Sequence, residues 1–393
     1  MSGTFRKPRI AVILGTIAAV GPFTTDMYLP AFPAVAADLN ATAAAVQGTL
    51  VTYFLALALG QLVYGPLSDR LGRRLPLLVG FATFVLSSIG CALAQDIGSL
   101  ALLRFLQALG GCSGMVIARA VVRDVAEGPA AVRLMANLMM VSGIAPVIAP
   151  GIGSLMLGIT GWRGIFGVLA VYGAIVVLLV LMTLPESLPK ERRRRDSPVA
   201  TLLLFGALMR DRHFMGHALA GTMPIAGMFV YIISSPFVYM QIFGVSPQLF
   251  SLFFGANAAG IYLLGRIVSR LALTRQPEEL LRVFSWQPVI GGAVVLAGAL
   301  TGQFWFVAAG LWIFVAAIGA LVPLAVATAM SRQGHAAGSA SALIGTMQFG
   351  LGAGLGAMVG ALYTGTALPM AAAVAVCGLG GFLALRLVPP KPA

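Results

Sequence analysis

The sequence predicts an all-α membrane protein with twelve transmembrane helices arranged as two six-helix halves. Of its 393 residues, 59% are hydrophobic and 9% are charged, whereas soluble domains carry about 25% charged residues. The mean hydropathy is +0.96. A bilayer-spanning helix needs about 20 mostly apolar residues, so a chain of this length has room for about a dozen spans with short connections. Basic residues also gather in alternate connections, as a multi-pass chain requires.

Apolar runs separated by polar or charged residues give the expected spans in chain order. The runs are 10–31, 44–66, 75–94, 99–121, 131–157, 163–184, 213–241, 248–272, 281–300, 304–329, 337–362 and 368–387. The first run follows three basic residues, as a secretory signal would. It is longer than a signal core and leads into further spans, so we interpret it as a retained first helix.

The charges of the connections orient the spans. One set of connections holds nearly all the basic residues, including the run Arg192–Arg195, while the opposite set holds Asp38 and Asp96, with Arg163 as the exception. Cytoplasmic loops carry the excess of Lys and Arg. We therefore expect a multi-pass membrane protein with both termini in the cytoplasm. The net charge of +13 is assigned to loops at the anionic inner leaflet rather than to nucleic-acid binding.

A polar segment near the middle of the chain suggests the division into halves. It predicts a six-helix bundle at 1–184, a cytoplasmic linker at 185–212 and a second six-helix bundle at 213–393. The pattern Gly-x-x-x-x-Arg-Leu occurs at Gly65–Leu71 and again at Gly265–Leu271, an offset of 200 residues. Such an offset is typical of a parallel repeat of two halves.

Three sequence motifs resemble those of the major facilitator superfamily. Gly65–Arg74 reads Gly-Pro-Leu-Ser-Asp-Arg-Leu-Gly-Arg-Arg and is similar to the superfamily's G-x-L-[SA]-D-R-x-G-R-[RK] loop between helices 2 and 3. Leu103–Gly110 in the fourth span resembles its R-x-x-Q-G pattern, with Ala108 in place of the common glycine. Residues 146–153 in the fifth span resemble a loose form of its proline- and glycine-rich antiporter motif. The resemblance implies the fold of that superfamily.

A fourth motif resembles one branch of this superfamily. Asp26–Pro33 reads Asp-Met-Tyr-Leu-Pro-Ala-Phe-Pro and is similar to the signature of the bicyclomycin and chloramphenicol resistance (Bcr/CflA) drug:proton antiporters. The resemblance covers essentially the whole chain. It implies a monomer that exports small neutral or mildly polar drugs in exchange for protons by alternating access. A carrier for a metabolite such as a sugar or an amino-acid derivative, built on the same machinery, is the alternative.

Asp26 and Arg104 are the candidate proton-coupling pair. Asp26 lies about 16 residues into the first span, at mid-depth or beyond, and an ionisable group there is costly and points to function. A low dielectric favours a neutral carboxyl and a nearby cation favours its ionised form, so such a group could load and release a proton. The alternative for Asp26 is a structural salt bridge or a helix cap.

Arg104 lies near the outer end of the fourth span, at a depth comparable to Asp26. A guanidinium cannot be discharged in practice, so it could hold Asp26 ionised. The resemblance assigns the arginine of this span a role in proton coupling, and the alternative is an interhelical hydrogen-bonding post. Gln107 lies one turn away on the same helix face and could bond Arg104 or a ligand.

The loop between the second and third spans is a candidate conformational latch. Asp69 could cap a helix N-terminus of the other half and pair with a basic residue at the inner end of the fourth span, which would hold an outward-open state. The latch residues are Gly65, Asp69, Arg70, Gly72, Arg73, Arg119 and Arg123. The resemblance favours this latch over a charge cluster that only fixes orientation.

Two further groups of residues are candidates for conformational change and drug binding. Prolines bend helices and small residues allow close approach, so the fifth span holds a hinge or a tightly packed seal at Pro146, Pro150, Gly151 and Gly153. Polar and aromatic residues inside spans are candidates for the substrate cavity, although many such residues face lipid or core. They are Asp26, Tyr28, Tyr53, Gln107, Asn137, Tyr231, Phe237, Asn257 and Gln348.

Several function classes are disfavoured by what the sequence lacks. It contains no Gly-x-x-x-x-Gly-Lys-[Ser/Thr] run, which argues against ATP as the energy source. Its three cysteines lie inside apolar runs, and with three histidines and twelve acidic residues we find neither metal-ligand spacing nor a hydrolytic triad. We therefore expect no cofactor, no metal and no enzymatic activity. The expected partners are a drug, protons and the lipid bilayer.

Overall fold

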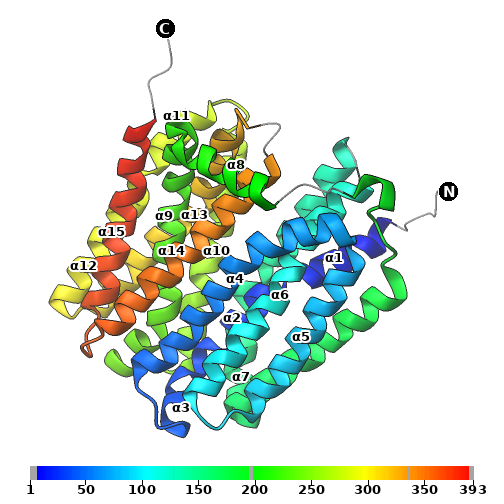
Figure 1. Ribbon diagram of the computed structural model, residues 1–393. Coiled ribbons are helices and arrows are strands. Elements are labelled where there is room, and N and C mark those ends of the chain that lie inside the picture. The colour runs from blue at the N-terminus through cyan, green and yellow to red at the C-terminus, as the bar shows by residue number, and fades with distance from the viewer. Residues whose placement is uncertain (1–6, 127, 194–197, 334–336, 389–393) are drawn as a thin grey trace. The chain divides into compact units, whose positions relative to one another are not determined.

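The computed structural model describes residues 7–126, 128–193, 198–333 and 337–388. All regular secondary structure in these ranges is helical (Figure 1), which confirms the predicted fold class. The chain divides into two compact units. Unit 1 comprises residues 1–41 and 52–195, and unit 2 comprises residues 42–51 and 196–393. The first turns of the second span therefore belong with unit 2.

Unit 1 holds the helices of the first half of the chain. They are α1 (Lys7–Ala18), α2 (Val20–Asp26), η1 (Leu29–Ala31), α3 (Phe32–Asp38), α4 (Ala43–Leu71), α5 (Arg74–Leu93), α6 (Ile97–Val125), α7 (Gly128–Thr183) and η2 (Lys190–Arg192). Helices α5 and α6 lie side by side, and α7 packs along α5 (Figure 1).

The first span is longer than predicted and is built from short helical pieces. Helices α1, α2, η1 and α3 follow one another almost without interruption, so the candidate span runs from Ile10 to Asp38 instead of ending at residue 31. Pro30 and Pro33 do not end it, because each lies in the first positions of a new helical piece, where a missing N–H group is tolerated. Asp38, predicted in a connection, is the last residue of α3.

The connection between the second and third spans is shorter than predicted. Helix α4 continues through Gly65 and Pro66 to Leu71, and α5 starts at Arg74, so only two residues of the predicted ten-residue loop are non-helical. The hydroxyl of Ser68 donates to the carbonyl of Gly65 at 3.0 Å. Gly72, with φ +95°, makes the turn in a backbone conformation that favours glycine.

Helix α7 is two antiparallel spans. Its mostly apolar segment from Gly143 to Thr183 has 41 residues. As one helix it would extend about 60 Å, about twice the thickness of a bilayer core. Gly161, with φ 70° and ψ −177°, breaks it. Val141 lies against Gly15 while the Tyr172 hydroxyl donates to the carbonyl of Thr16. Residues 31 positions apart therefore reach the same level of α1, which requires the chain to reverse between them.

Eleven helical segments of the described residues are long and apolar enough to cross a membrane. The segment Gly143–Thr183 is counted as one of them. Dividing it at Gly161 yields twelve spans, which agrees with the twelve apolar runs predicted from the sequence. The boundary between the fifth and sixth spans was expected at residues 157–163, where this glycine lies.

Unit 2 holds the helices of the second half. They are α8 (Pro198–Arg210), α9 (Arg212–Pro236), the π-helical turn η3 (Phe237–Ile242), α10 (Pro247–Leu271), α11 (Pro277–Phe284), α12 (Trp286–Thr301), α13 (Phe304–Met330), α14 (Ala337–Ala361), α15 (Leu368–Ala384) and η5 (Leu385–Leu387). Helix α8 lies within the predicted linker 185–212 and packs against α9 and α14.

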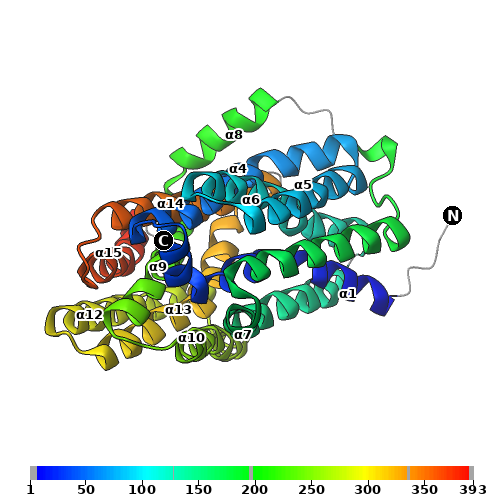
Figure 2. The ribbon, with the colours of Figure 1, turned by 90° about the horizontal axis from the view of Figure 1, so that it is seen from below.

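Glycines bring the helices of unit 2 into close contact. Helices α12 and α13 lie side by side (Figure 2). A Cβ atom added at Gly291 of α12 would lie 2.6 Å from the backbone N of Phe314, and one added at Gly319 of α13 would lie 2.0 Å from the carbonyl O of Ile261. Small residues at such positions permit the backbone contacts that hold membrane helices together.

The Gly161→Ala variant should destabilise the protein by about 1–3 kcal/mol, because alanine at this backbone conformation is strained. The measurement is thermal or denaturant unfolding of the purified chain. Gly158→Ala is the matched control, since this helical glycine faces open space and alanine there should be neutral or slightly stabilising. Equal stability of the two variants would show that Gly161 is not the turn between spans.

Candidate functional site

Asp26 is buried near the middle of the first span. It ends α2 and lies 16 residues after Ile10 and 12 residues before Asp38, the two ends of that span. Only 4% of its surface is exposed. Its Oδ1 atom accepts a hydrogen bond of 2.9 Å from the hydroxyl of Thr25. The structure therefore places an acid at mid-span with a hydroxyl as its neighbour.

Arg104 of α6 is fully buried, with 0% exposure. Its Nη1 atom donates to the backbone carbonyl of Thr24 at 3.1 Å and to Oε1 of Gln107 at 2.6 Å. Gln107 in turn donates from Nε2 to the hydroxyl of Ser88 at 2.7 Å. This chain of hydrogen bonds connects α6 to α2 on one side and to α5 on the other.

Aromatic rings surround the Arg104 guanidinium. Its Cζ atom lies 4.3 Å from the ring centroid of Tyr53, 4.9 Å from that of Tyr28 and 5.7 Å from that of Phe166. Cation–π contacts of this kind are worth about 2 kcal/mol or more when they are desolvated. Among the described residues, the Nε and Nη2 atoms of Arg104 have no hydrogen-bond partner although they are buried. The cage therefore retains donors that a ligand or water could use.

Asp26 and Arg104, the candidate proton-coupling pair, are connected indirectly. Within the described part of the chain, no ion pair joins the two residues. They are connected instead through consecutive residues of α2, since Arg104 binds the carbonyl of Thr24 and Thr25 binds the carboxyl of Asp26. The arginine thus fixes the helix that carries the acid.

The structure groups some of the predicted cavity residues and separates others. Tyr28, Tyr53 and Gln107 all contact Arg104 in unit 1. In unit 2, Asn257 Nδ2 donates to the Tyr231 hydroxyl at 2.8 Å. Phe237 is buried with its ring 6.3 Å from that of Tyr363, and Asn137 and Gln348 are half-buried.

The fifth-span residues lie in a regular helix. Pro146 and Pro150 are inside α7, whose only non-helical residue is Gly161. A Cβ atom at Gly153 would lie 2.0 Å from the carbonyl O of Met27, whereas Gly151 faces open space. Gly153 is therefore closely packed against Met27, the residue that follows Asp26, and the hinge remains a prediction.

Arg73 is the centre of the charged network at the connection between α4 and α5. It is 6% exposed. Its Nη1 atom contacts Asp69 Oδ1 at 2.6 Å and donates to the Ser68 hydroxyl at 2.8 Å, while Nε contacts Asp124 Oδ2 at 2.8 Å. The two carboxylates hold the pKa of Arg73 above its ordinary value in spite of burial.

Glu186, just beyond the end of α7, closes this network. Its carboxylate accepts hydrogen bonds from the backbone N–H groups of Arg73 at 2.7 Å, Leu188 at 3.0 Å and Arg74 at 3.2 Å. Partial burial opposes ionisation, but these three bonds and the nearby Arg193 lower the pKa of Glu186. A Cβ atom at Gly72 would lie 2.4 Å from Oε2 of Glu186, so glycine is required there for a second reason.

The predicted pairing of Asp69 with Arg119 or Arg123 is wrong in this structure. Asp69 pairs with Arg73, and Arg119 donates from Nε to the carbonyl of Met115 at 3.0 Å. Arg70 and Arg123 are exposed, and Gly65 is half-buried with open space around it. The basic residues of the proposed latch therefore do not all meet at one point.

Sequence reasoning missed Asp124 and Glu186, the carboxylates that complete the network. A signal was available for both. Asp124 lies at the inner end of the fourth predicted span and Glu186 just beyond the inner end of the sixth. Alternating topology places those ends on the same side as the Gly65–Arg74 loop, so acids there are natural partners for its arginines.

A model of the Major Facilitator Superfamily matches residues 14–357 of the chain. The chain is 40% identical over 378 residues to YdgK of Bacillus subtilis, named as an uncharacterized MFS-type transporter, with 95% of this chain and 94% of that one covered. It is 30% identical over 367 residues to a bicyclomycin resistance protein homolog of Haemophilus influenzae, with 93% and 92% covered. A solved D-xylose-proton symporter matches with a TM-score of 0.74, 14% identity and 96% of each chain covered, a likeness of fold alone.

The Arg104→Lys variant should keep the charge but unfold at a lower temperature than the wild type. Lysine offers a compact ammonium in place of a planar guanidinium, so it cannot contact the rings of Tyr28 and Tyr53 and also keep both bonds made by Nη1, at a cost of about 1.5–3 kcal/mol. Thermal unfolding of the purified chain measures this. Arg270→Lys, on the exposed end of α10, is the control and should leave stability unchanged. A similar effect of both variants would contradict the role given to the cage.

The lowered pKa of Glu186 predicts an acid-sensitive contribution to stability. A carboxyl whose pKa is lower when folded stabilises the protein above its unfolded value of 4.5, and the contribution is lost as pH falls below that value. The wild type should therefore lose stability between about pH 5 and pH 3 more steeply than Glu186→Gln. Glu279→Gln, an exposed carboxyl of α11, should keep the wild-type slope. Parallel curves for wild type and Glu186→Gln would refute the assignment.

Proposed function

Because this chain belongs to the major facilitator superfamily and is a membrane transporter rather than an enzyme, we propose that it exports small neutral or mildly polar drugs in exchange for protons. The proposed drugs are of the bicyclomycin or chloramphenicol kind. The Haemophilus influenzae relative is named as a bicyclomycin resistance protein homolog, which supports this choice. The proposed setting is a bacterial inner membrane, with one chain acting alone and both termini in the cytoplasm.

The observation that carries the proposal is the position of Asp26 among the acids of the spans. The other carboxyl groups of the described candidate spans lie at or next to a span end, and they are Asp38, Asp69, Asp124, Glu278 and Glu279. Asp26 alone lies in a span interior, and it is buried. An acid at that depth costs several kcal/mol unless it is protonated or paired, so its retention indicates a use.

We assign to Asp26 the binding site for which proton and drug compete. With the proton bound, the carboxyl is neutral and suited to its apolar surroundings. A drug that enters from the cytoplasm displaces this proton, or binds only after it has left. The loaded carrier turns outward by alternating access, releases the drug, and Asp26 takes up one proton from outside before the carrier returns.

Arg104 supports this exchange in two ways. Its hydrogen bond to the Thr24 carbonyl holds α2, and therefore the carboxyl of Asp26, in position. Its charge is permanent and buried, so it stabilises Asp26 during the interval in which that group is ionised. The rings of Tyr28 and Tyr53 keep the guanidinium in place without adding a negative charge that would neutralise it.

The Asp26→Asn variant tests the proposal. In proteoliposomes under an imposed pH gradient, the wild type should move chloramphenicol against its concentration gradient, and Asp26→Asn should fall to the rate of empty liposomes. Asparagine keeps the shape of the side chain but cannot exchange a proton, so chloramphenicol should still bind to the variant. Gradient-driven transport at the wild-type rate in Asp26→Asn would overturn the assignment.

Asp96→Asn is the matched control for that experiment. Asp96 lies outside the candidate spans and caps α6 by accepting from the backbone N–H of Ser99 at 2.9 Å. Asparagine caps helices about as well as aspartate, so this variant makes the same chemical change without removing an acid from a span. It should transport at the wild-type rate.

A further inference from the structure

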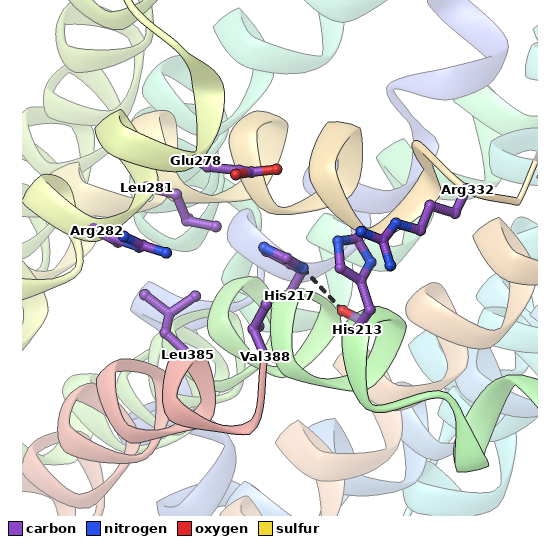
Figure 3. Close-up of a pocket in the computed structure, with 8 residues that line it drawn as sticks. All are labelled: His213, His217, Glu278, Leu281, Arg282, Arg332, Leu385 and Val388. Carbon is purple, nitrogen blue, oxygen red and sulfur yellow. Dashed lines mark hydrogen bonds between the residues drawn. The ribbon is translucent and has the colours of Figure 1, made fainter. Parts of the chain in front are cut away.

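A small pocket lies within unit 2, where several helix ends meet (Figure 3). Its polar lining comes from His213 and His217 of α9, Glu278 and Arg282 of α11, and Arg332 just after α13. Aliphatic side chains complete the wall. The cavity measures about 30 Å³, far below the roughly 300–1,000 Å³ of a drug site. It is therefore suited to a single small group rather than to the exported substrate.

Two buried histidines line the inner part of this pocket. His213 is 7% exposed and His217 is 4% exposed, and their ring centroids lie 4.5 Å apart. The Nδ1 atom of His217 contacts the backbone carbonyl O of His213 at 2.9 Å. The Nδ1 atom of His213 has no hydrogen-bond partner among the described residues. Buried polar atoms are normally hydrogen-bonded, so this nitrogen indicates a missing ligand.

Figure 3 shows the guanidinium of Arg332 beside the His213 ring and that of Arg282 on the other side of the pocket. Both arginines are exposed. In the described residues, neither forms an ion pair with a carboxylate. With Glu278 as the one acid in the lining, the pocket has an excess of positive charge even when both imidazoles are neutral.

The corresponding helix ends of unit 1 have more carboxylates beside their arginines. There, the Arg73 guanidinium contacts the carboxylates of Asp69 and Asp124, and Glu186 accepts from the backbone N–H of Arg73. In the second half, Arg332 lies two residues after the end of α13, and the 200-residue offset of the repeat gives Arg386 at the position that Glu186 occupies in the first half. At these helix ends unit 2 therefore has several cations, with Glu278 as the one acid in the lining of the pocket.

We propose that this pocket binds a phosphate-type oxyanion, supplied either as the headgroup of an anionic phospholipid or as free phosphate. Guanidinium groups bind phosphate oxygens through paired N–H donors, and the imidazole nitrogens add donors from the inner wall. The pocket lies at the ends of apolar spans, the depth at which headgroups are found and at which basic pockets bind anionic lipids. The bound anion joins α9, α11 and the end of α13, as carboxylates do in unit 1.

The test uses the full chain purified in detergent, with two probes measured by equilibrium titration at constant ionic strength. One probe is inorganic phosphate. The other is short-chain phosphatidylglycerol, with short-chain phosphatidylcholine as the lipid of zero net charge. The wild type should bind phosphatidylglycerol more tightly than phosphatidylcholine if the anion is a headgroup, and should bind inorganic phosphate if the anion is free in solution.

Variants of the exposed arginines locate the binding. Arg282→Gln and Arg332→Gln should each weaken binding about tenfold, as expected for the loss of one charge-assisted hydrogen bond. Arg275→Gln removes an exposed arginine of the same unit that does not line the pocket and should leave affinity unchanged. The proposal is overturned if neither probe binds the wild type, or if Arg282→Gln and Arg332→Gln bind as tightly as Arg275→Gln.

Discussion

The lack of water in the core of a bilayer is the constraint on which the rest of this structure depends. A buried N–H, C=O or charged group there must find its partner inside the protein. The described spans are accordingly all helical. Their acids lie at or near the ends of the spans, with Asp26 as the exception. Keeping a carboxyl in the interior of a span costs free energy, so the burial of Asp26 indicates a function.

Arg104 shows how such a position is supported. Its guanidinium has no ion-pair partner within the described residues, but it binds Thr24 and Gln107 and lies among three aromatic rings. These contacts tie together α2, α5 and α6. They stabilise the cation without using the carboxyl of Asp26, so the acid remains available to bind a proton or a ligand. Structural and chemical roles are thereby divided between two neighbouring residues.

The charged ends of the helices differ between the two units. In unit 1, the guanidinium of Arg73 pairs with Asp69 and Asp124, and that of Arg74 donates to the carbonyl of Leu181. Around His213 in unit 2, cations converge with a single acid among them.

The sequence predicted those features that depend on local composition. Hydropathy located the spans, and the depth of Asp26 and Arg104 followed from counting residues along them. Prediction from the sequence failed where contacts between distant residues determine the structure. The first span was expected to end at residue 31, whereas Pro30 and Pro33 each lie at the start of a new helical piece, and Pro66 lies inside α4. Asp69 was assigned to Arg119 or Arg123, whereas its partner is Arg73.

The grouping of residues around the pocket of unit 2 could not be predicted from the sequence, for the same reason. His213, Glu278 and Arg332 are separated by more than fifty residues along the chain, and only packing of α9, α11 and α13 brings them together. The Arg104 cage likewise needs Phe166 from the second half of α7, which reaches it because the chain reverses at Gly161. Contacts of this kind depend on helix packing rather than on hydrophobic pattern.

The central claim is that drug and proton compete for Asp26, and proton release on drug binding tests it most directly. Chloramphenicol is added to the purified chain in weakly buffered solution, and the pH change is recorded. If binding of one ligand displaces the other, the wild type should release up to about one proton per drug bound, and Asp26→Asn should bind the drug without releasing any. Equal proton release from wild type and Asp26→Asn, or none from the wild type at saturating drug, would contradict the account.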